Sequence, residues 1–361
     1  MIIVLLGVAW SYVEEYFKDT TESSFKEISS VINSEELKHQ VGSIIVSFQS
    51  LLAKLDEQFF PDHPSKEIEK PVLNQPKEHV FSIYNIEIGA VKAEVEASVG
   101  EPQRLTLNEY GKHWSTYHED YRNFMNVMYD ENDYVIGLYT NQDLIASTVG
   151  ITLGSSKDEV RQQLGDPMTG IRKGLIIYQY QQDAGYDVFN VNESYVTIFY
   201  DIHENDTVTA IQIIEEQTEK EKAGYYADAS EELKKGLEYQ LFDVTNATRV
   251  VHNLSLLTWD DNVKKTARAH SLDMAENHYF NHTNLRGQSP FDRMEEDELA
   301  FTMAGENLAY GQISSIFAHE GLMNSLGHRE NILQSKYQFL GVGVAFNSEN
   351  HPYYTENFYR K

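Results

Sequence analysis

The spacing of apolar residues changes along the chain and divides it into segments. Residues 1–10 are almost continuously apolar, over about half the length of a membrane-spanning helix. From residue 25 to residue 55, apolar residues recur every three to five positions, which predicts an amphipathic helix. Residues 124–139 and 196–211 instead alternate apolar and polar positions around Asn-Asp turns. That period predicts paired β-strands.

We interpret residues 1–20 as the remnant of an export signal or a membrane anchor, the alternative being the start of a short hydrophobic helix. Cysteine is absent, so a lipoprotein anchor is excluded. Residues 21–76 are predicted to be a helical spacer that ends in a proline-containing stretch.

An internal repeat organises the next segment. The pattern Gly, Lys-x-Glu-Val, Gly, Pro of residues 88–102 recurs in residues 153–167, at an offset of 65 residues. Each copy predicts a glycine in a turn, followed by a short helix. A second glycine caps the end of this helix, and the proline two residues later prevents the helix from continuing. With the alternating strands that follow, this indicates two α+β units packed as one domain over residues 77–215. A binding or scaffolding role suits its residue types better than catalysis.

A charged linker is predicted at residues 216–236, followed by a second domain at residues 237–361. Residues 237–251 have helical periodicity, and Asp260 is a candidate N-cap for a helix over residues 262–278. Residues 339–346 and 353–359 have the composition of strands. The predicted class is therefore α+β throughout.

The net charge and the amino-acid composition exclude several classes of function. The formal net charge is −27, of which −21 lies in residues 1–230. Such a surface repels phosphates, so a general nucleic-acid binder is excluded. The lack of cysteine excludes disulfides, Cys-ligated zinc and thiol nucleophiles. Seven of the 13 histidines lie in the last 131 residues, which biases ligand-type chemistry toward the second domain.

Five motifs in that domain carry a resemblance. They are Leu-x-Trp-Asp with Ala-x-x-His-Ser-x-Asp-Met (257–274), Tyr-Phe-x-His (279–282), Gly-Glu-Asn-Leu (305–308), Asn-Ser-x-Gly-His-Arg-x-Asn-Ile-Leu (324–333) and Gly-Val-Gly-Val (341–344). In this order, they resemble the CAP superfamily, or SCP-like extracellular domain. The repeat domain resembles the CAP-associated domain that precedes this module in some Gram-positive bacterial proteins.

The resemblance implies an α-β-α sandwich with a cleft of two histidines and two acidic residues, which binds a divalent metal in some members. His282, Glu306 and His328 match three of these positions. The second acidic position falls near Ser325, so the tetrad is incomplete. Glu356 stands where the family commonly has Gln, and would restore the missing charge if its strand faces the cleft. His282 and His328 are the predicted ligands of Zn²⁺ or another divalent cation.

Other candidate sites have simpler explanations. His319-Glu320 does not continue to a second zinc-binding histidine, because Met323 occupies that position. We interpret His270 as packed or hydrogen-bonded, and His278 as a surface residue at a helix end. A Ser–His nucleophile lacks the required elbow motif.

Two functions remain open. The first is a non-enzymatic binding module of the cell surface or extracellular space, whose cleft takes a metal ion or a small-molecule, peptide or cell-wall ligand. The N-terminus would be its membrane tether. The second is a metal-dependent hydrolase or protease in which Glu306 activates water and the two histidines hold zinc. The missing acidic position and the absence of a nucleophile favour the first.

Overall fold

The computed structural model describes residues 68–180, 185–222 and 224–361. The predicted anchor at residues 1–20 and most of the predicted spacer at residues 21–76 lie outside these ranges. No helix in the part that is described is long and apolar enough to cross a membrane.

The internal repeat forms two matching helices, α3 (Lys92–Val99) and α4 (Lys157–Leu164). Gly100 and Gly165 end them with φ angles of 81° and 84°, a left-handed conformation that glycine adopts without steric cost. Ser156 and Glu159 cap the start of α4 reciprocally. The glycine spacing of the sequence therefore sets the length of both helices.

The strands after each helix join in one antiparallel sheet of seven strands, in the order β2-β3-β4-β5-β11-β10-β9. β5 and β11 pair at its centre, so each repeat supplies one side of the sheet. The strands are β2 (Arg104–Leu107), β3 (His113–Glu119), β4 (Arg122–Tyr129), β5 (Val135–Thr140), β9 (Tyr186–Val191), β10 (Ser194–Asp201) and β11 (Thr207–Glu215). Two short pairs lie outside this sheet: β1 (Phe81–Ile83) with β6 (Ile145–Ser147), and β7 (Gly170–Lys173) with β8 (Ile176–Gln179).

The predicted linker contains regular structure. It holds α5 (Glu216–Glu221) and the start of α6 (Glu231–Val251), which begins six residues before the predicted position. The hydroxyl of Ser230 accepts a hydrogen bond from the amide of Leu233 and caps α6. The first turns of α6 are rich in Glu and Lys, so their apolar periodicity is weak although they are helical.

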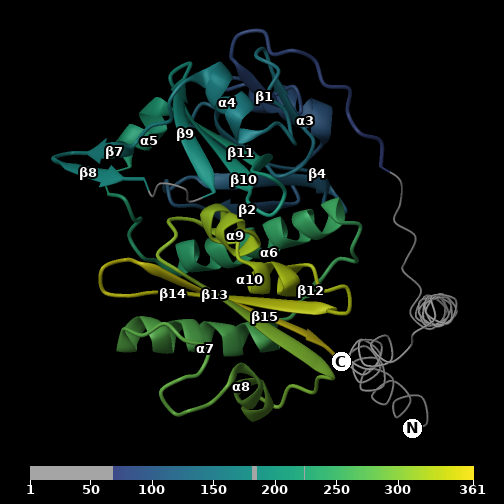
Figure 1. Cartoon of the computed structure of the whole chain (residues 1–361), viewed down its shortest axis with the longest axis vertical. Helices are drawn as coiled ribbons and strands as arrows, with labels where there is room; N and C mark the ends of the chain where they lie inside the picture. Colours follow the sequence, from purple (N-terminus) through teal and green to yellow (C-terminus); the bar gives the residue numbers. More distant parts are fainter. Residues whose placement is uncertain (1–67, 181–184, 223) are drawn as a thin grey trace, which may run out of the picture. The chain divides into compact units, whose positions relative to one another are not determined.

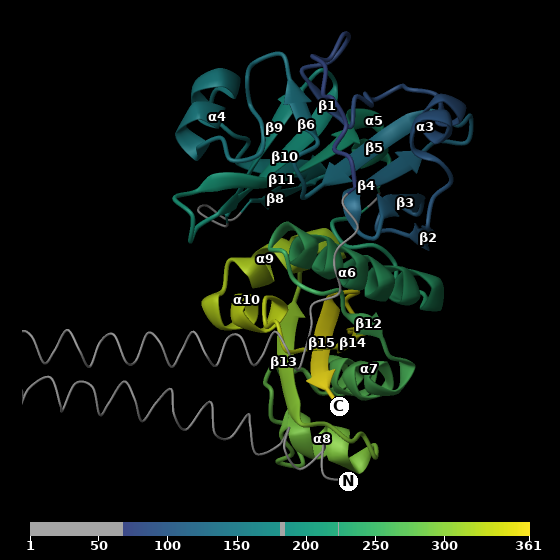
Figure 2. The same ribbon diagram turned by 90° about the vertical axis from the view of Figure 1, so that its right-hand side faces the viewer.

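The second domain has three layers, which confirms the predicted α-β-α sandwich (Figures 1 and 2). Its four-stranded sheet has the order β12 (Thr258–Trp259), β14 (Phe339–Phe346), β15 (Pro352–Arg360), β13 (Met303–Tyr310). α7 (Asp261–Asn277) and α8 (Pro290–Glu296) cover one face, and α6, α9 (Ser315–Met323) and α10 (Leu326–Ile332) cover the other. The side chain of Asp260 caps α7, as predicted.

The two domains share a core, with α6 packed between their sheets (Figure 2). Apolar side chains of the seven-stranded sheet, including Trp114 and Tyr139, pack against Val244 of α6 and Ile316 of α9. α6 approaches β2 so closely that a Cβ atom at Gly236 would collide with the carbonyl of Leu107. Residues Glu67–Lys361 accordingly form one unit.

Candidate functional site

His282 and Glu306 form the centre of the predicted cleft. His282 lies in the loop after α7, and its Nδ1 is 2.9 Å from Oε1 of Glu306 on β13. The side chain of His282 is 48% exposed, whereas that of Glu306 is 1% exposed. An Nδ1–H that donates to a carboxylate leaves Nε2 of the ring as the free nitrogen. His282 thus presents Nε2 to the outside, on a ring that a buried carboxylate holds in place.

The second oxygen of Glu306 is also engaged. Arg293 of α8 donates from Nη2 to Glu306 Oε2 at 2.6 Å, and from Nη1 to the backbone carbonyl of His282 at 2.7 Å. Both side chains of the Glu306–Arg293 pair are more than nine-tenths buried. The guanidinium neutralises the buried carboxylate, which would otherwise pay a large desolvation cost.

His328 lies on α10 and comes near the same cleft. Burial and the neighbouring charge of His282 both lower the pKa of His328 below the usual histidine value. His328 is therefore a neutral imidazole at pH 7, the form that binds metal ions. The amide of Asn307 donates to the backbone carbonyl of His328 at 3.1 Å. The structure thus pairs His282 with Glu306, and His328 is close enough for the charge of His282 to act on its pKa.

The two further predicted residues are placed differently. Ser325 is the N-cap residue of α10, half-buried, and its side chain makes no capping hydrogen bond within the described chain. Glu356 is fully buried on β15, directly opposite Asn307 of β13. Opposed residues on paired strands share a face of the sheet and successive residues alternate. The Glu356 carboxylate therefore lies on the α6 side and that of Glu306 on the α8 side, so Glu356 is behind the cleft rather than in it.

Glu356 belongs to a chain of buried hydrogen bonds. Its carboxylate accepts from Thr245 of α6 at 2.9 Å and from Asn307 at 3.1 Å. Burial raises the pKa of Glu356 to about 7. Through Asn307, the same network reaches the backbone of His328.

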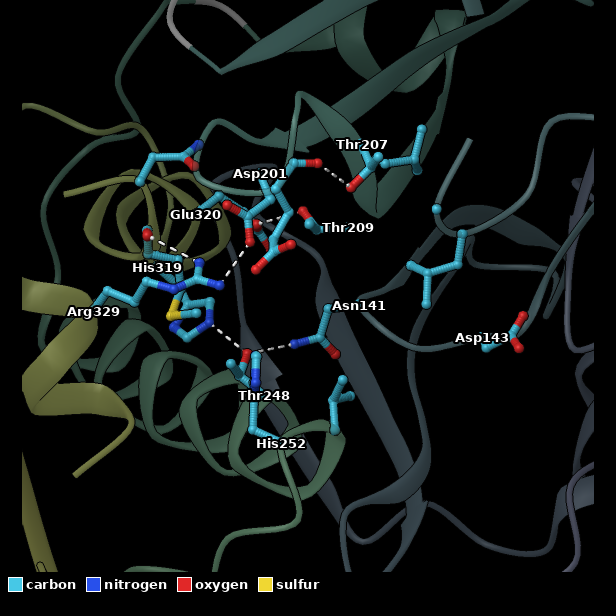
Figure 3. A pocket seen from close by; sticks show the side chains of 17 residues that line it. Asn141, Asp143, Asp201, Thr207, Thr209, Thr248, His252, His319, Glu320 and Arg329 are labelled. Carbon is cyan, nitrogen blue, oxygen red and sulfur yellow. Dashed lines mark hydrogen bonds and ion pairs between the residues drawn. The ribbon is translucent and has the colours of Figure 1, made fainter. Parts of the chain in front are cut away.

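This chain of hydrogen bonds continues through His319 to the interface between the two domains (Figure 3). Its Nδ1 is 3.4 Å from the hydroxyl of Thr245, and its Nε2 is 2.6 Å from that of Thr248, which accepts from Asn141 of the repeat domain at 2.9 Å. Burial lowers the pKa of His319 to about 3, so the ring is neutral. A neutral ring has one donor and one acceptor nitrogen, which suits a hydrogen-bond chain that runs in one direction.

Two other histidines of this domain, His270 and His278, are placed as predicted. His270 is buried, with Nε2 3.0 Å from the carbonyl oxygen of Asn281. His278 is exposed and ends α7 in a left-handed conformation. Across the described residues, no group of three or more His, Asp or Glu side chains is placed to hold a metal ion. A metal at this site would thus rely on His282 and His328.

Sequence reasoning missed Arg293, Asn307 and Thr245. Asn307 lies within the Gly-Glu-Asn-Leu motif, so it carried a signal. Arg293 and Thr245 lie on helices outside the five motifs, and their roles depend on contacts between distant segments.

The chain matches two protein families. Residues 88–225 match the CAP-associated N-terminal family, and residues 242–358 match the cysteine-rich secretory protein family, CAP. The chain is 31% identical over 287 residues to a Bacillus subtilis protein called uncharacterized membrane protein YlbC, covering 74% of this chain and 81% of the relative. It is 37% identical over 124 residues to YkwD of the same organism, covering 34% of this chain and 47% of the relative.

Solved structures share the fold. An extracellular protein containing an SCP domain from Bacillus anthracis superposes with a TM-score of 0.66 at 24% identity, covering 83% of this chain and 100% of that one. A cysteine-rich secretory protein from Staphylococcus aureus superposes with a TM-score of 0.59 at 16% identity, covering 76% and 91%. The two-domain architecture therefore recurs in other bacterial proteins.

Proposed function

The chain belongs to the cysteine-rich secretory protein (CAP) family with a CAP-associated N-terminal domain, and from this premise we propose that it is a non-enzymatic binding module of the bacterial cell surface. Its ligand contacts the cleft at His282 and His328. The names of two relatives, one a membrane protein and one an extracellular protein, support this location.

The engagement of both oxygens of Glu306 carries the proposal. A general base needs an oxygen that is exposed to the water or substrate from which it removes a proton. Glu306 instead accepts from His282 on one oxygen and from Arg293 on the other. The side chain of Glu306 is also only 1% exposed, so water and substrate do not reach its carboxylate. Glu306 therefore acts by fixing the ring of His282.

The residues fit a weakly held divalent cation. Nε2 of His282 and the neutral imidazole of His328 are nitrogen donors of the kind that Zn²⁺ accepts. Glu306 would orient His282, as outer carboxylates commonly orient metal-binding histidines. When bound, the cation would supply a positive charge that attracts an anionic or carbonyl group of a peptide or cell-wall ligand. Two protein ligands make such a site labile.

Calorimetric titration with Zn²⁺ tests the proposal. We expect His282→Ala and His328→Ala each to weaken zinc uptake at least tenfold, a loss of about 1.4 kcal/mol. His203→Ala is the matched control, because His203 is exposed in the repeat domain and distant in sequence from the cleft. Equal uptake by all four proteins would overturn the metal site.

A peptide-library digest distinguishes the hydrolase alternative. A binding module gives no cleavage with or without Zn²⁺. Cleavage that is present in the wild-type chain and lost in Glu306→Gln would support the hydrolase and contradict the proposal.

A further inference from the structure

A short hairpin of the repeat domain exposes a run of apolar side chains. It consists of β7 and β8, which are joined by a turn at Gly174 and Leu175. Leu175, Ile176 and Ile177 are 98%, 57% and 55% exposed. In the other parts of the chain that the structure describes, no two consecutive large apolar residues are exposed. Single exposed apolar residues are common on folded proteins, but a contiguous group marks a contact surface.

One face of the hairpin packs on the rest of the chain. Lys173 Nζ is 2.6 Å from Oε1 of Glu219 on α5, and both side chains are largely buried. Tyr178 stacks on Tyr225 with ring centroids 4.8 Å apart, and Ile171 is buried. A two-stranded hairpin is only marginally stable by itself. These contacts therefore fix the hairpin, so that its other face and its turn stay exposed.

The opposite face combines a cation with apolar side chains. The strand register pairs Arg172 with Ile177 and Lys173 with Ile176. Paired residues share a face of the hairpin and successive residues alternate. Because Lys173 faces the domain, Arg172 and Ile177 face outward, and both are exposed. Ile176 shares the inner face with Lys173 and is still more than half exposed, since it lies beside the turn.

The hairpin differs in charge from the rest of the chain. Acidic side chains outnumber basic ones by 56 to 29 in the whole sequence, but residues 170–180 contain Arg172 and Lys173 and no acidic residue. Glu219 neutralises Lys173, which leaves Arg172 as the exposed charge of the hairpin. The acidic body of the protein repels an anionic surface, whereas the hairpin attracts one.

The size and shape of the exposed tip favour a lipid bilayer over a folded partner. A stable protein interface takes about 800 Å² and roughly 20–30 residues from each partner. The tip has three exposed apolar side chains, on a hairpin that extends sideways from the domain (Figure 1). A bilayer needs no complementary surface, because apolar side chains enter its hydrocarbon while a neighbouring arginine reaches the lipid phosphates. Tyrosines such as Tyr178 and Tyr180 are typical of the boundary between lipid and water.

We propose that the β7–β8 hairpin is a membrane-contact site, whose turn inserts Leu175, Ile176 and Ile177 into the outer part of a lipid bilayer while Arg172 binds lipid phosphate. The site lies in the repeat domain and does not depend on the His282 cleft. It holds the acidic chain at a lipid surface in a defined orientation.

The chain contains no cysteine, so a single label can be placed at the tip. Leu175→Cys is labelled in the full chain with the fluorophore NBD, whose emission shifts to the blue when it leaves water. Leu285→Cys with the same label is the matched control, because Leu285 is 66% exposed in the loop between α7 and α8 of the CAP domain. Vesicles of phosphatidylglycerol and phosphatidylethanolamine in equal parts are added to each protein. We expect a blue shift at position 175 and none at position 285. Membrane binding by residues 1–20 would not by itself remove water from either label.

Two further changes, each made in the labelled Leu175→Cys chain, separate apolar insertion from charge. Ile176→Ser with Ile177→Ser is expected to raise the lipid concentration at half-maximal shift at least about tenfold, because two apolar side chains no longer leave water. Arg172→Gln is expected to raise it about fivefold through the loss of one charge near an anionic surface. Thermal unfolding of each variant confirms that it is folded.

Three results would overturn the proposal. The first is an absent shift at position 175, or an equal shift at positions 175 and 285. The second is a half-maximal lipid concentration that the two serine substitutions leave unchanged. The third is a label at position 175 that is blue-shifted before vesicles are added, together with a dimer in analytical ultracentrifugation, which would assign the hairpin to a contact between two copies of the chain.

Discussion

Tyr139 of the repeat domain donates a hydrogen bond of 2.9 Å to the carboxylate of Glu320 in the CAP domain, and both side chains are buried. Burial raises the pKa of Glu320 to about 7, even though Tyr139 and Thr209 stabilise the charged form. The contact between the domains is therefore polar as well as apolar, and Tyr139 supplies one of its buried polar contacts.

Removal of this phenol is expected to destabilise the chain. Tyr139→Phe leaves a buried carboxyl without its main donor, which costs about 1–3 kcal/mol of unfolding free energy. The loss is expected to be larger at pH 8, where Glu320 is charged, than at pH 5, where it is protonated. Urea denaturation at the two pH values measures both quantities. Tyr134→Phe, at a position that is 47% exposed, should change little, and an equal loss in both variants would contradict the role of the Tyr139 contact.

Arg293 is expected to be essential for the stability of the His282 cleft. Arg293→Met leaves the buried carboxylate of Glu306 without its cation, a change that costs about 3–5 kcal/mol in comparable buried pairs. Arg286→Met is the matched control, because Arg286 and Glu296 are 68% and 51% exposed and such surface pairs contribute about 0–1 kcal/mol. Chemical denaturation reports both values.

A double variant separates charge from packing. If the loss in Arg293→Met comes from the unpaired carboxylate, addition of Glu306→Gln restores part of the stability. No recovery in the double variant would mean that Arg293 stabilises the cleft mainly through its backbone contact with His282.

The parts of the fold that depend on local sequence were predictable. Gly100 and Gly165 end their helices because a left-handed residue is needed there, and Asp260 caps α7 through contacts to the next residues. The start of α6 was not predictable from apolar periodicity, since its first turns are charged and depend on the cap by Ser230.

The site was predictable in part, for a related reason. The motifs identified His282, Glu306 and His328, but strand alternation decides which face each carboxylate occupies. The register that sets Asn307 opposite Glu356 could not be read from either strand alone. The interdomain bonds, such as that between Asn141 and Thr248, join residues 107 positions apart. The local sequence pattern contains no information on which residues from distant segments form hydrogen bonds with each other.

Glu356 is expected to make stability depend on pH. Its pKa is raised from 4.5 to about 7 in the folded chain, so the folded state binds the proton more tightly than the unfolded state does. This contribution is fully present below pH 4.5 and is lost as the pH rises to 7. The unfolding free energy of the wild-type chain relative to Glu356→Gln should therefore fall over this window, by at most about 3 kcal/mol.

Denaturation of both proteins at several pH values between 4 and 8 measures this difference, in which the contributions of other groups cancel. Glu349→Gln is the control, since Glu349 is 73% exposed and a surface substitution has little effect. A difference that rises with pH would show that Glu356 is charged and well solvated in the folded state.

Two helical glycines are expected to respond in opposite directions to the same substitution. Alanine normally stabilises a helix by about 1 kcal/mol relative to glycine. At Gly321 of α9 a new Cβ atom meets nothing within 4 Å, so Gly321→Ala should raise the unfolding free energy by about this amount.

At Gly236 of α6 the Cβ atom would collide with the backbone carbonyl of Leu107 on β2. Backbone atoms cannot rotate away, so Gly236→Ala must separate α6 from the repeat domain and should lower stability by at least about 2 kcal/mol. Thermal and urea unfolding of the two variants measure the contrast, and stabilisation in both would show that α6 and β2 are not in close contact in solution.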